Sequence, residues 1–239
     1  MAQPYFIIRS ESDPEFIGVT NGIKQADILR EGFENPENYD HLMSSLGSRN
    51  YWNIKHLIPQ MEFELECAKL LPEAIRTDFL MFGPVLIGAP YLISAKVSRI
   101  LDDCKLHNTR RFPAKVLDQE GNTHPYELLY QETMSDSVVD FGKSIYYTGS
   151  SLTGRKHVRF ASSEEKEDFA EKNFDLKYEE LHLNDEFDQS LDFFLNRNGA
   201  RVISGRLRNK LEEAKATGLI VLPCTNGTEG NPVLIAPYM

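Results

Sequence analysis

The chain contains the stretch LISAKVSRILDDCKLHNTRRFP at residues 92–113, and a matching stretch, VISGRLRNKLEEAKATGLIVLP, follows at residues 202–223. The two align without a gap at an offset of 110 positions, with Ser94 on Ser204. Convergence would explain part of the match, because any capped amphipathic helix shares some of this pattern. A gapless match of this length instead favours shared ancestry or shared architecture, and two copies are too few for a solenoid.

Each copy predicts a capped helix followed by a strand. The serine hydroxyl can accept from the exposed N–H groups of a first helical turn. Apolar residues then recur at spacings of four, four and three, which places them on one helix face. They are Ile93, Val97, Leu101 and Cys104 in the first copy and Ile203, Leu207, Leu211 and Ala214 in the second. A short polar link leads to a strand that ends at proline, so we expect two similar helix–strand units.

Short runs of aromatic and β-branched residues predict further strands, such as residues 5–9 and 145–148. Weaker patterns predict a strand over 16–20, a short helix over 23–33 and irregular structure over 36–49. The fold class expected is α+β, with mostly antiparallel short strands and a few helices. We expect an N-terminal α/β region over 1–84 and a repeat-bearing region over 85–239, packed together as one compact unit.

The net charge of −10 is concentrated in one segment of the 239-residue chain. Between Glu164 and Asp192 lie twelve acids and three bases, so this segment carries −9 and the rest of the chain −1. A general nucleic-acid-binding protein needs a basic surface, so we expect no nucleic-acid partner. Ser162 and Glu165 form a capping box, which predicts a polar helix at the start of the acidic segment.

The sequence shows no sign of a membrane or secreted protein. No apolar run reaches the roughly 18 residues that a membrane span needs, and the first residues lack the pattern of a secretory signal. Cys67, Cys104 and Cys224 are spaced too widely for a disulfide framework or a metal knuckle. We therefore expect a cytoplasmic protein with reduced, mostly buried thiols and no membrane contact, and self-association is left open.

The sequence contains no known catalytic motif, and we expect no metal ion and no cofactor. Gly142-Lys143-Ser144 lacks the earlier glycine that a phosphate loop requires, and no two histidines lie at metal-binding spacing on a helix. An enzyme site assembled from distant residues is an alternative, in which His157, Arg155, Lys156 and Arg159 hold an anionic substrate. These residues would otherwise form a basic strand edge that pairs with the acidic segment.

The second copy, extended to RVISGRLRNKLEEAKATGLIVLP, resembles the C-terminal motif of immunity-protein family eleven of bacterial polymorphic toxin systems. That motif runs apolar–Ser–x–Arg–Leu, then Leu-Glu-Glu-Ala, then Thr-Gly, apolar residues and Pro. DFFL before it is similar to the family's preceding strand, and Gly205 departs from the charged residue that members often carry. Similarity to the family's middle section is found in LISAKV, FPAKV, DQEG and Tyr126, at residues 92–97, 112–116, 118–121 and 126.

The resemblance covers roughly residues 85 to 223 and implies a protein that binds and neutralises a cognate bacterial toxin inside the producing cell. It implies no enzymatic activity, because the motif carries no catalytic residue, and it does not identify the toxin. A partner-binding protein unrelated to toxins is a further alternative.

The acidic segment is the expected contact if the toxin is basic, because opposite charges speed encounter. The alternative is that this segment is only a solvent-exposed helix with its flanking residues and contacts no partner. Phe174, Tyr178 and Phe187 are candidate aromatic anchors, unless they belong to the core. The expected partner-binding residues are Glu164, Glu165, Glu167, Asp168, Glu179, Glu180, Asp185 and Glu186.

Overall fold

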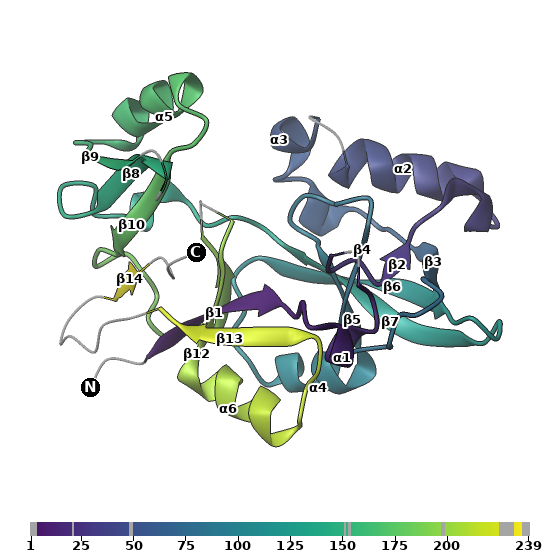
Figure 1. Cartoon of the computed structure of the whole chain (residues 1–239). Helices are drawn as coiled ribbons and strands as arrows, with labels where there is room; N and C mark the ends of the chain where they lie inside the picture. Colours follow the sequence, from purple (N-terminus) through teal and green to yellow (C-terminus); the bar gives the residue numbers. More distant parts are fainter. Residues whose placement is uncertain are drawn as a thin grey trace. The chain divides into compact units, whose positions relative to one another are not determined.

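A computed structural model of the chain describes residues 4–20, 22–47, 50–150, 152, 154–196, 199–224 and 232–235. Its elements confirm the α+β class, with mostly antiparallel strand pairing (Figure 1). The helices are α1 (Pro14–Ile17), α2 (Pro36–Leu46), α3 (Tyr51–Ile54), α4 (Ala95–Asp102), α5 (Ser163–Lys172) and α6 (Gly205–Glu213). Short 3₁₀ turns occupy Arg30–Gly32, Ile58–Gln60 and Asp136–Val138. The strands are β1 (Tyr5–Ser10), β2 (Ala26–Asp27), β3 (Leu65–Leu70), β4 (Phe79–Gly83), β5 (Tyr91–Ser94), β6 (Thr109–Leu117), β7 (Thr123–Gln131), β8 (Ile145–Ser150), β9 (Gly154–Val158), β10 (Lys177–His182), β11 (Phe193–Leu195), β12 (Arg201–Ser204), β13 (Leu219–Pro223) and β14 (Val233–Ile235).

The chain divides into two compact units, each built from separate chain segments. The first contains residues 1–8, 133–205 and 221–239, and the second contains residues 9–132 and 206–220. The division differs from the boundary expected after residue 84, which would separate β4 from its antiparallel neighbour β5. Sequence order conceals the true division because α6, late in the chain, belongs with the segment that starts at Arg9.

The second unit is built around a closed barrel with the strand order β2-β3-β6-β7-β5-β4. The long strands β6 and β7 form an antiparallel hairpin in which Thr109 lies opposite Gln131 and Leu117 opposite Thr123. The barrel interior is apolar, and α2 adds Leu42 and Leu46 to it. Core residues contributed by the strands include Leu65, Ala68, Leu80, Phe82, Leu92, Phe112, Val116 and Leu128.

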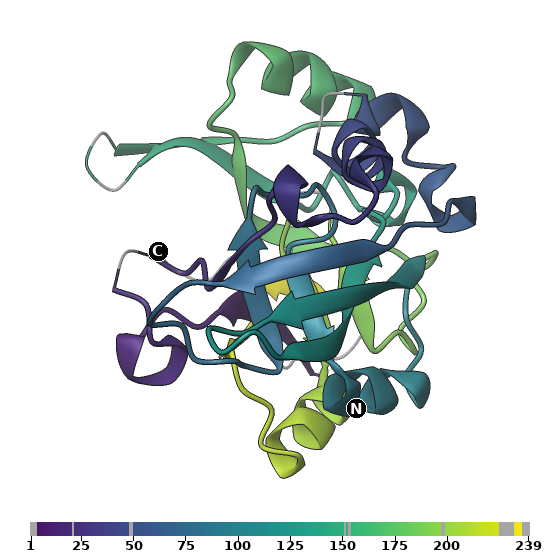
Figure 2. The same ribbon diagram turned by 90° about the vertical axis from the view of Figure 1, so that its right-hand side faces the viewer.

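The first unit contains a sheet with the strand order β14-β10-β8-β9. Its core combines side chains from this sheet with side chains from β1, β11 and β12, among them Tyr5, Tyr146, Leu181 and Phe194. Phe160, which follows β9, joins the same core. Helix α5 lies beside the β8–β9 hairpin in both views (Figure 1; Figure 2). Phe169 of α5 packs against Phe160, with ring centroids 5.4 Å apart.

The two copies of the repeat fold alike, and each is longer than the sequence match. In each copy two paired strands precede the helix: β4 and β5 before α4, and β11 and β12 before α6. Ser94 Oγ donates to the Asp78 carboxylate at 2.7 Å, and Ser204 Oγ donates to Asp192 at 2.7 Å. The backbone N–H of each serine donates to the carbonyl of the same aspartate, at 2.9 and 2.8 Å. An aspartate before the first strand is therefore part of the repeat.

The strand after the helix is β6 in the first copy and β13 in the second. A fourth strand completes the sheet of each copy, and it comes before the other three in one copy and after them in the other. In the first copy β7 pairs with β5, and Tyr126 lies opposite Ser94. In the second copy β1 pairs with β12, and Tyr5 lies opposite Ser204. The strand orders β4-β5-β7-β6 and β11-β12-β1-β13 therefore correspond. The N-terminal strand takes the position in the second copy that β7 has in the first.

Three of the weaker predictions are wrong. The strand expected over 16–20 is absent, because its first two residues end helix α1 and residues 18–20 form no strand. Most of the expected loop over 36–49 is helix α2. The expected helix over 23–33 is instead strand β2 followed by a 3₁₀ turn. Both missed helices begin with proline after a capping side chain, Asp13 in α1 and Asn35 in α2. Proline suits the first helical position because its missing N–H would have no partner there.

All three cysteines are free thiols. Cys224 is buried, and burial raises its pKa to about 12, whereas Cys67 and Cys104 are partly buried. Within the part of the chain that the structure describes, no helix has both the length and the apolar character needed to cross a membrane.

Candidate functional site

Helix α5 begins at the predicted capping box. Ser162 Oγ accepts a hydrogen bond from the backbone N–H of Glu165 at 3.2 Å, and Glu165 Oε2 accepts one from the N–H of Ala161 at 2.7 Å. These bonds satisfy amides that have no partner within the helix, and the first turn also favours acidic side chains. Glu165 thus has a structural role at this end of α5.

The base in the middle of α5 is turned away from solvent. Lys166 Nζ lies 2.9 Å from Asp136 Oδ2, and the two side chains are only 8% and 9% exposed. Ser163 Oγ donates to the same carboxylate oxygen at 2.9 Å, and Phe141 presents its ring 6.0 Å from the ammonium group. Burial of this ion pair removes the positive charge of Lys166 from the helix surface. The exposed face of α5 therefore carries more net negative charge than the helix as a whole.

The exposed acids of α5 repel one another. Glu164 and Asp168 lie four residues apart, as do Glu167 and Glu171, and all four side chains are exposed. Like charges at this spacing are neighbours on a helix and destabilise it by about 0.2–0.5 kcal/mol per pair. Glu171 also lies in the last turn of α5, where the helix dipole disfavours negative charge. We call these four residues the acidic face.

Two large apolar side chains are almost fully exposed at the adjoining end of the sheet. Phe174, in the turn between α5 and β10, is 95% exposed, and Leu152, in the turn between β8 and β9, is 96% exposed. The N–H of Gly149 donates to Asp175 Oδ2 at 2.7 Å, which joins the turn between α5 and β10 to strand β8. The other candidate anchors, Tyr178 and Phe187, are buried in the core. Phe174 is therefore the anchor candidate that a partner could reach.

The remaining predicted acids do not join the acidic face. Glu179 and Glu180 lie on β10 and are partly buried, and Glu180 Oε2 is 3.2 Å from Nε2 of His182. Asp185 and Glu186 are exposed in the turn after β10. The structure thus gathers Glu164, Glu165, Glu167 and Asp168 on one helix and places the other four on a strand and a turn. Glu171 belongs to the acidic face but was missed, although its spacing of four from Glu167 is visible in the sequence.

Side chains of the basic edge strand β9 form ion pairs with Glu179 of the acidic segment, as one of the two sequence hypotheses predicts. His157 Nε2 lies 2.7 Å from Glu179 Oε2, and Arg155 Nη1 lies 3.6 Å from Glu179 Oε1. The Arg155 guanidinium also stacks over the ring of Tyr147, with Cζ 4.6 Å from the centroid. Two cationic or potentially cationic groups therefore surround one carboxylate.

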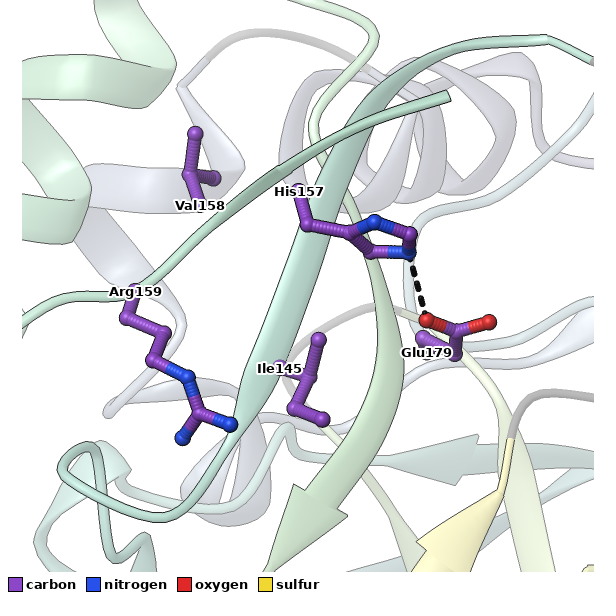
Figure 3. Close-up of a pocket in the computed structure, with 5 residues that line it drawn as sticks. All are labelled: Ile145, His157, Val158, Arg159 and Glu179. Atoms are coloured by element: carbon purple, nitrogen blue, oxygen red, sulfur yellow. Dashed lines mark ion pairs between the residues drawn. The ribbon is translucent and has the colours of Figure 1, made fainter. Parts of the chain in front are cut away.

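These strands border an open pocket of about 530 Å³, lined by Ile145, His157, Val158, Arg159 and Glu179. Figure 3 shows His157 and Glu179 pointing toward each other beside Ile145, with the Arg159 guanidinium on the same side of β9 and the Val158 side chain on the other. Arg159 Nη1 donates to the carbonyl oxygens of Gly142 and Lys143 at 3.3 and 3.2 Å.

The loop that receives Arg159 is itself ordered by Asp140. Lys143 Nζ lies 2.8 Å from Asp140 Oδ2, and the backbone N–H of Lys143 donates to Asp140 Oδ1 at 3.2 Å. The side-chain hydrogen bond from Lys143 holds the pKa of the Asp140 carboxyl below its usual range. The loop is thus a fixed acceptor for the Arg159 side chain.

Among the described residues, no group of three or more His, Cys, Asp or Glu side chains is arranged to hold a metal ion. In comparisons with known proteins, no family model and no curated protein matches this sequence.

Proposed function

We propose that this chain is a non-enzymatic immunity-type protein, which binds a basic bacterial toxin in the cytoplasm of the producing cell and blocks it. The observation that carries the proposal is the acidic face of α5 beside the exposed ring of Phe174. The resemblance of the repeat to immunity-protein family eleven gives the class of partner. Both features support a binding protein whose contact lies on the first unit.

The electrostatics favour a basic partner. The two like-charge pairs, Glu164 with Asp168 and Glu167 with Glu171, disfavour the free helix, and Lys or Arg side chains of a partner would relieve that repulsion on binding. An exposed aromatic ring beside such a patch can fill an apolar pocket on the partner and supply a large share of the affinity. The acidic face then accelerates encounter, while Phe174 slows dissociation.

Reversal of charge on the acidic face tests the proposal. The triple variant Glu164→Lys, Glu167→Lys, Asp168→Lys leaves the capping residue Glu165 in place. We expect it to weaken binding to the toxin encoded by the neighbouring gene by about tenfold or more at low salt, and by less at high salt, because surface charges are screened. Affinity is measured by calorimetry, and protection of toxin-expressing cells gives a second readout.

The matched control reverses three exposed acids of the second unit, Glu73, Glu120 and Glu213. It changes the net charge equally, so a loss of affinity in both variants would reflect the total charge rather than the acidic face. Unchanged affinity of the first variant at low salt would remove α5 from the interface. A neighbouring gene that encodes no toxin would count against the proposed class of partner.

A further inference from the structure

The hairpin β8–β9 and its flanks form a basic region next to the acidic segment. Residues 141–163 contain four bases, Lys143, Arg155, Lys156 and Arg159, and no acid. His157 lies in the same stretch and lines the pocket with Arg159. Two of these bases pair with acids outside the stretch, Lys143 with Asp140 and Arg155 with Glu179. Arg159, at the pocket, instead donates to neutral carbonyl oxygens.

Arg159 is positioned at this pocket rather than left loose on the surface. Its Nη1 donates to the carbonyl oxygens of Gly142 and Lys143, which fixes the plane of the guanidinium. A guanidinium carries five N–H donors on three nitrogens, so Nε and Nη2 keep donors for a ligand. These donors suit a planar carboxylate, which can accept two parallel hydrogen bonds.

Among the described residues that line the pocket, the one carboxylate, Glu179, is offset by its neighbours. Glu179 lies 2.7 Å from His157 Nε2 and 3.6 Å from Arg155 Nη1, so its charge is directed at β9. Ile145 offers an apolar surface between Arg159 and the His157–Glu179 pair (Figure 3). The pocket thus combines one fixed cation with an apolar wall.

We propose that this pocket binds a small organic carboxylate, with the carboxylate on Arg159 and an apolar body against Ile145. The site is separate from the acidic face of α5 and does not depend on toxin binding. Because the pocket is open and holds one positioned cation, simple probes should bind weakly, with dissociation constants on the order of 1 mM.

The test uses 3-phenylpropionate as the probe and follows backbone amide signals of the full chain by NMR. We expect shifts centred on Ile145, His157 and Arg159, no comparable shifts with the neutral amide 3-phenylpropionamide, and much weaker shifts with acetate, which lacks the apolar body. Equal binding of the acid and the amide would overturn the proposal, as would shifts confined to other parts of the chain.

Variants locate the charge that binds. Arg159→Gln should weaken binding of 3-phenylpropionate by about tenfold, because it removes a charge-assisted bidentate contact. Lys172→Gln, which removes an exposed positive charge from α5, is the matched control and should bind as the unaltered chain does. Retained binding in Arg159→Gln would refute the assignment. If that variant does not fold, the comparison of acid with amide on the unaltered chain still decides the outcome.

A phenylalanine-terminated tetrapeptide and its C-terminal amide extend the test to a second source of the same group. Binding of 3-phenylpropionate without binding of the peptide acid would identify the ligand as a free small molecule. Tighter binding of the peptide acid than of 3-phenylpropionate would instead identify the C-terminal carboxylate of a polypeptide as the ligand. Failure of every carboxylate would overturn the site, whatever the result of the toxin-binding experiments.

Discussion

The side chain of Phe174 makes almost no contact with the rest of the protein. It lies two residues after the end of α5 and is 95% exposed. Phe174→Ala should therefore change the free energy of unfolding by less than about 0.5 kcal/mol, because an exposed side chain contributes little to the core. If Phe174 anchors the toxin, the same change should weaken binding by about tenfold or more. Thermal unfolding and calorimetric affinity measured on one preparation separate the two effects.

Phe187→Ala is the control, because it removes a phenylalanine that belongs to the core. Phe187 is 4% exposed and packs edge-to-face on Phe194 at 5.2 Å. Its truncation should cost about 3–5 kcal/mol of stability, as for other buried phenylalanines. A similar loss of stability in Phe174→Ala would show that Phe174 belongs to the core in solution.

The Asp78 carboxylate is held by four groups in the second unit. It accepts from Ser94 Oγ at 2.7 Å and from the N–H and Oγ1 of Thr217 at 3.0 and 3.1 Å, and Lys96 Nζ lies 2.6 Å away. Burial disfavours the charged form, but these bonds outweigh it and hold the pKa of Asp78 below its ordinary value. The ionised carboxylate is therefore a stabilising group.

The sign of the pH dependence follows from that lowered pKa. The stabilisation is fully present above the ordinary carboxyl pKa of about 4 and is lost as the pH falls below it. Asp78→Asn should lower the free energy of unfolding by about 1–3 kcal/mol at pH 7 and by clearly less at pH 3. Urea unfolding at both values checks this, with the exposed Glu73→Gln as control. An equal loss at both values would contradict a role for the charge.

Residue roles in the acidic segment were only partly readable from sequence. Phe174 and Tyr178 fit both an alternating and a helical pattern, and the choice depends on β8 pairing with β10, with Tyr146 opposite Tyr178. The sequence around Lys166 predicts a solvent-exposed base, because no local pattern identifies Asp136, thirty residues earlier, as its partner. A single sequence carries no direct record of such distant contacts.

At the scale of the element, α5 and α6 form a natural comparison because each has an exposed acid in its last turn. Glu171 lies in the last turn of α5 and Glu213 is the final residue of α6. Either residue changed to Lys should raise the stability of the free protein by about 0.3–1 kcal/mol, since a cation suits the C-terminal end of a helix. The proposed function predicts that only Glu171→Lys weakens toxin binding.

Thermal unfolding measures the stability of the two variants, and calorimetry measures their affinity for the toxin. A gain of stability in both, with loss of affinity in Glu171→Lys alone, would show that the acidic face is maintained for binding at the expense of stability. Loss of affinity in both variants, or in neither, would contradict that conclusion. The comparison needs no reference to the total charge, because both variants change it by the same amount.

Elements with strong local signals were predictable, and elements fixed by remote contacts were not. Helices α4 and α6 carry a cap or a stop signal and an apolar stripe, and the DQEG turn sets the β6–β7 hairpin. Helices α1 and α2 also have local signals, Asp13-Pro14 and Asn35-Pro36, which a search for apolar periodicity overlooks. Strand β2 has two residues and exists because β3 and β4 flank it.

At the scale of the whole molecule, the repeat predicted the architecture better than the linear division did. The offset of 110 holds from Ser94 and Ser204 into the strands that follow, while the preceding strands need a hairpin of different length. The equivalence of β1 with β7 could not be read from the sequence match, because only the pairing with β12 reveals it. The units therefore interleave along the chain.

This interleaving has a consequence for the order of assembly during synthesis. Strand β1 is synthesised roughly 200 residues before its partners β12 and β13, which makes this a very non-local pairing. The first copy, by contrast, holds its four strands between Phe79 and Gln131 and has them all once β7 has emerged. The nascent chain thus carries β1, an aromatic and aliphatic strand, without its sheet partners until β12 and β13 have been synthesised.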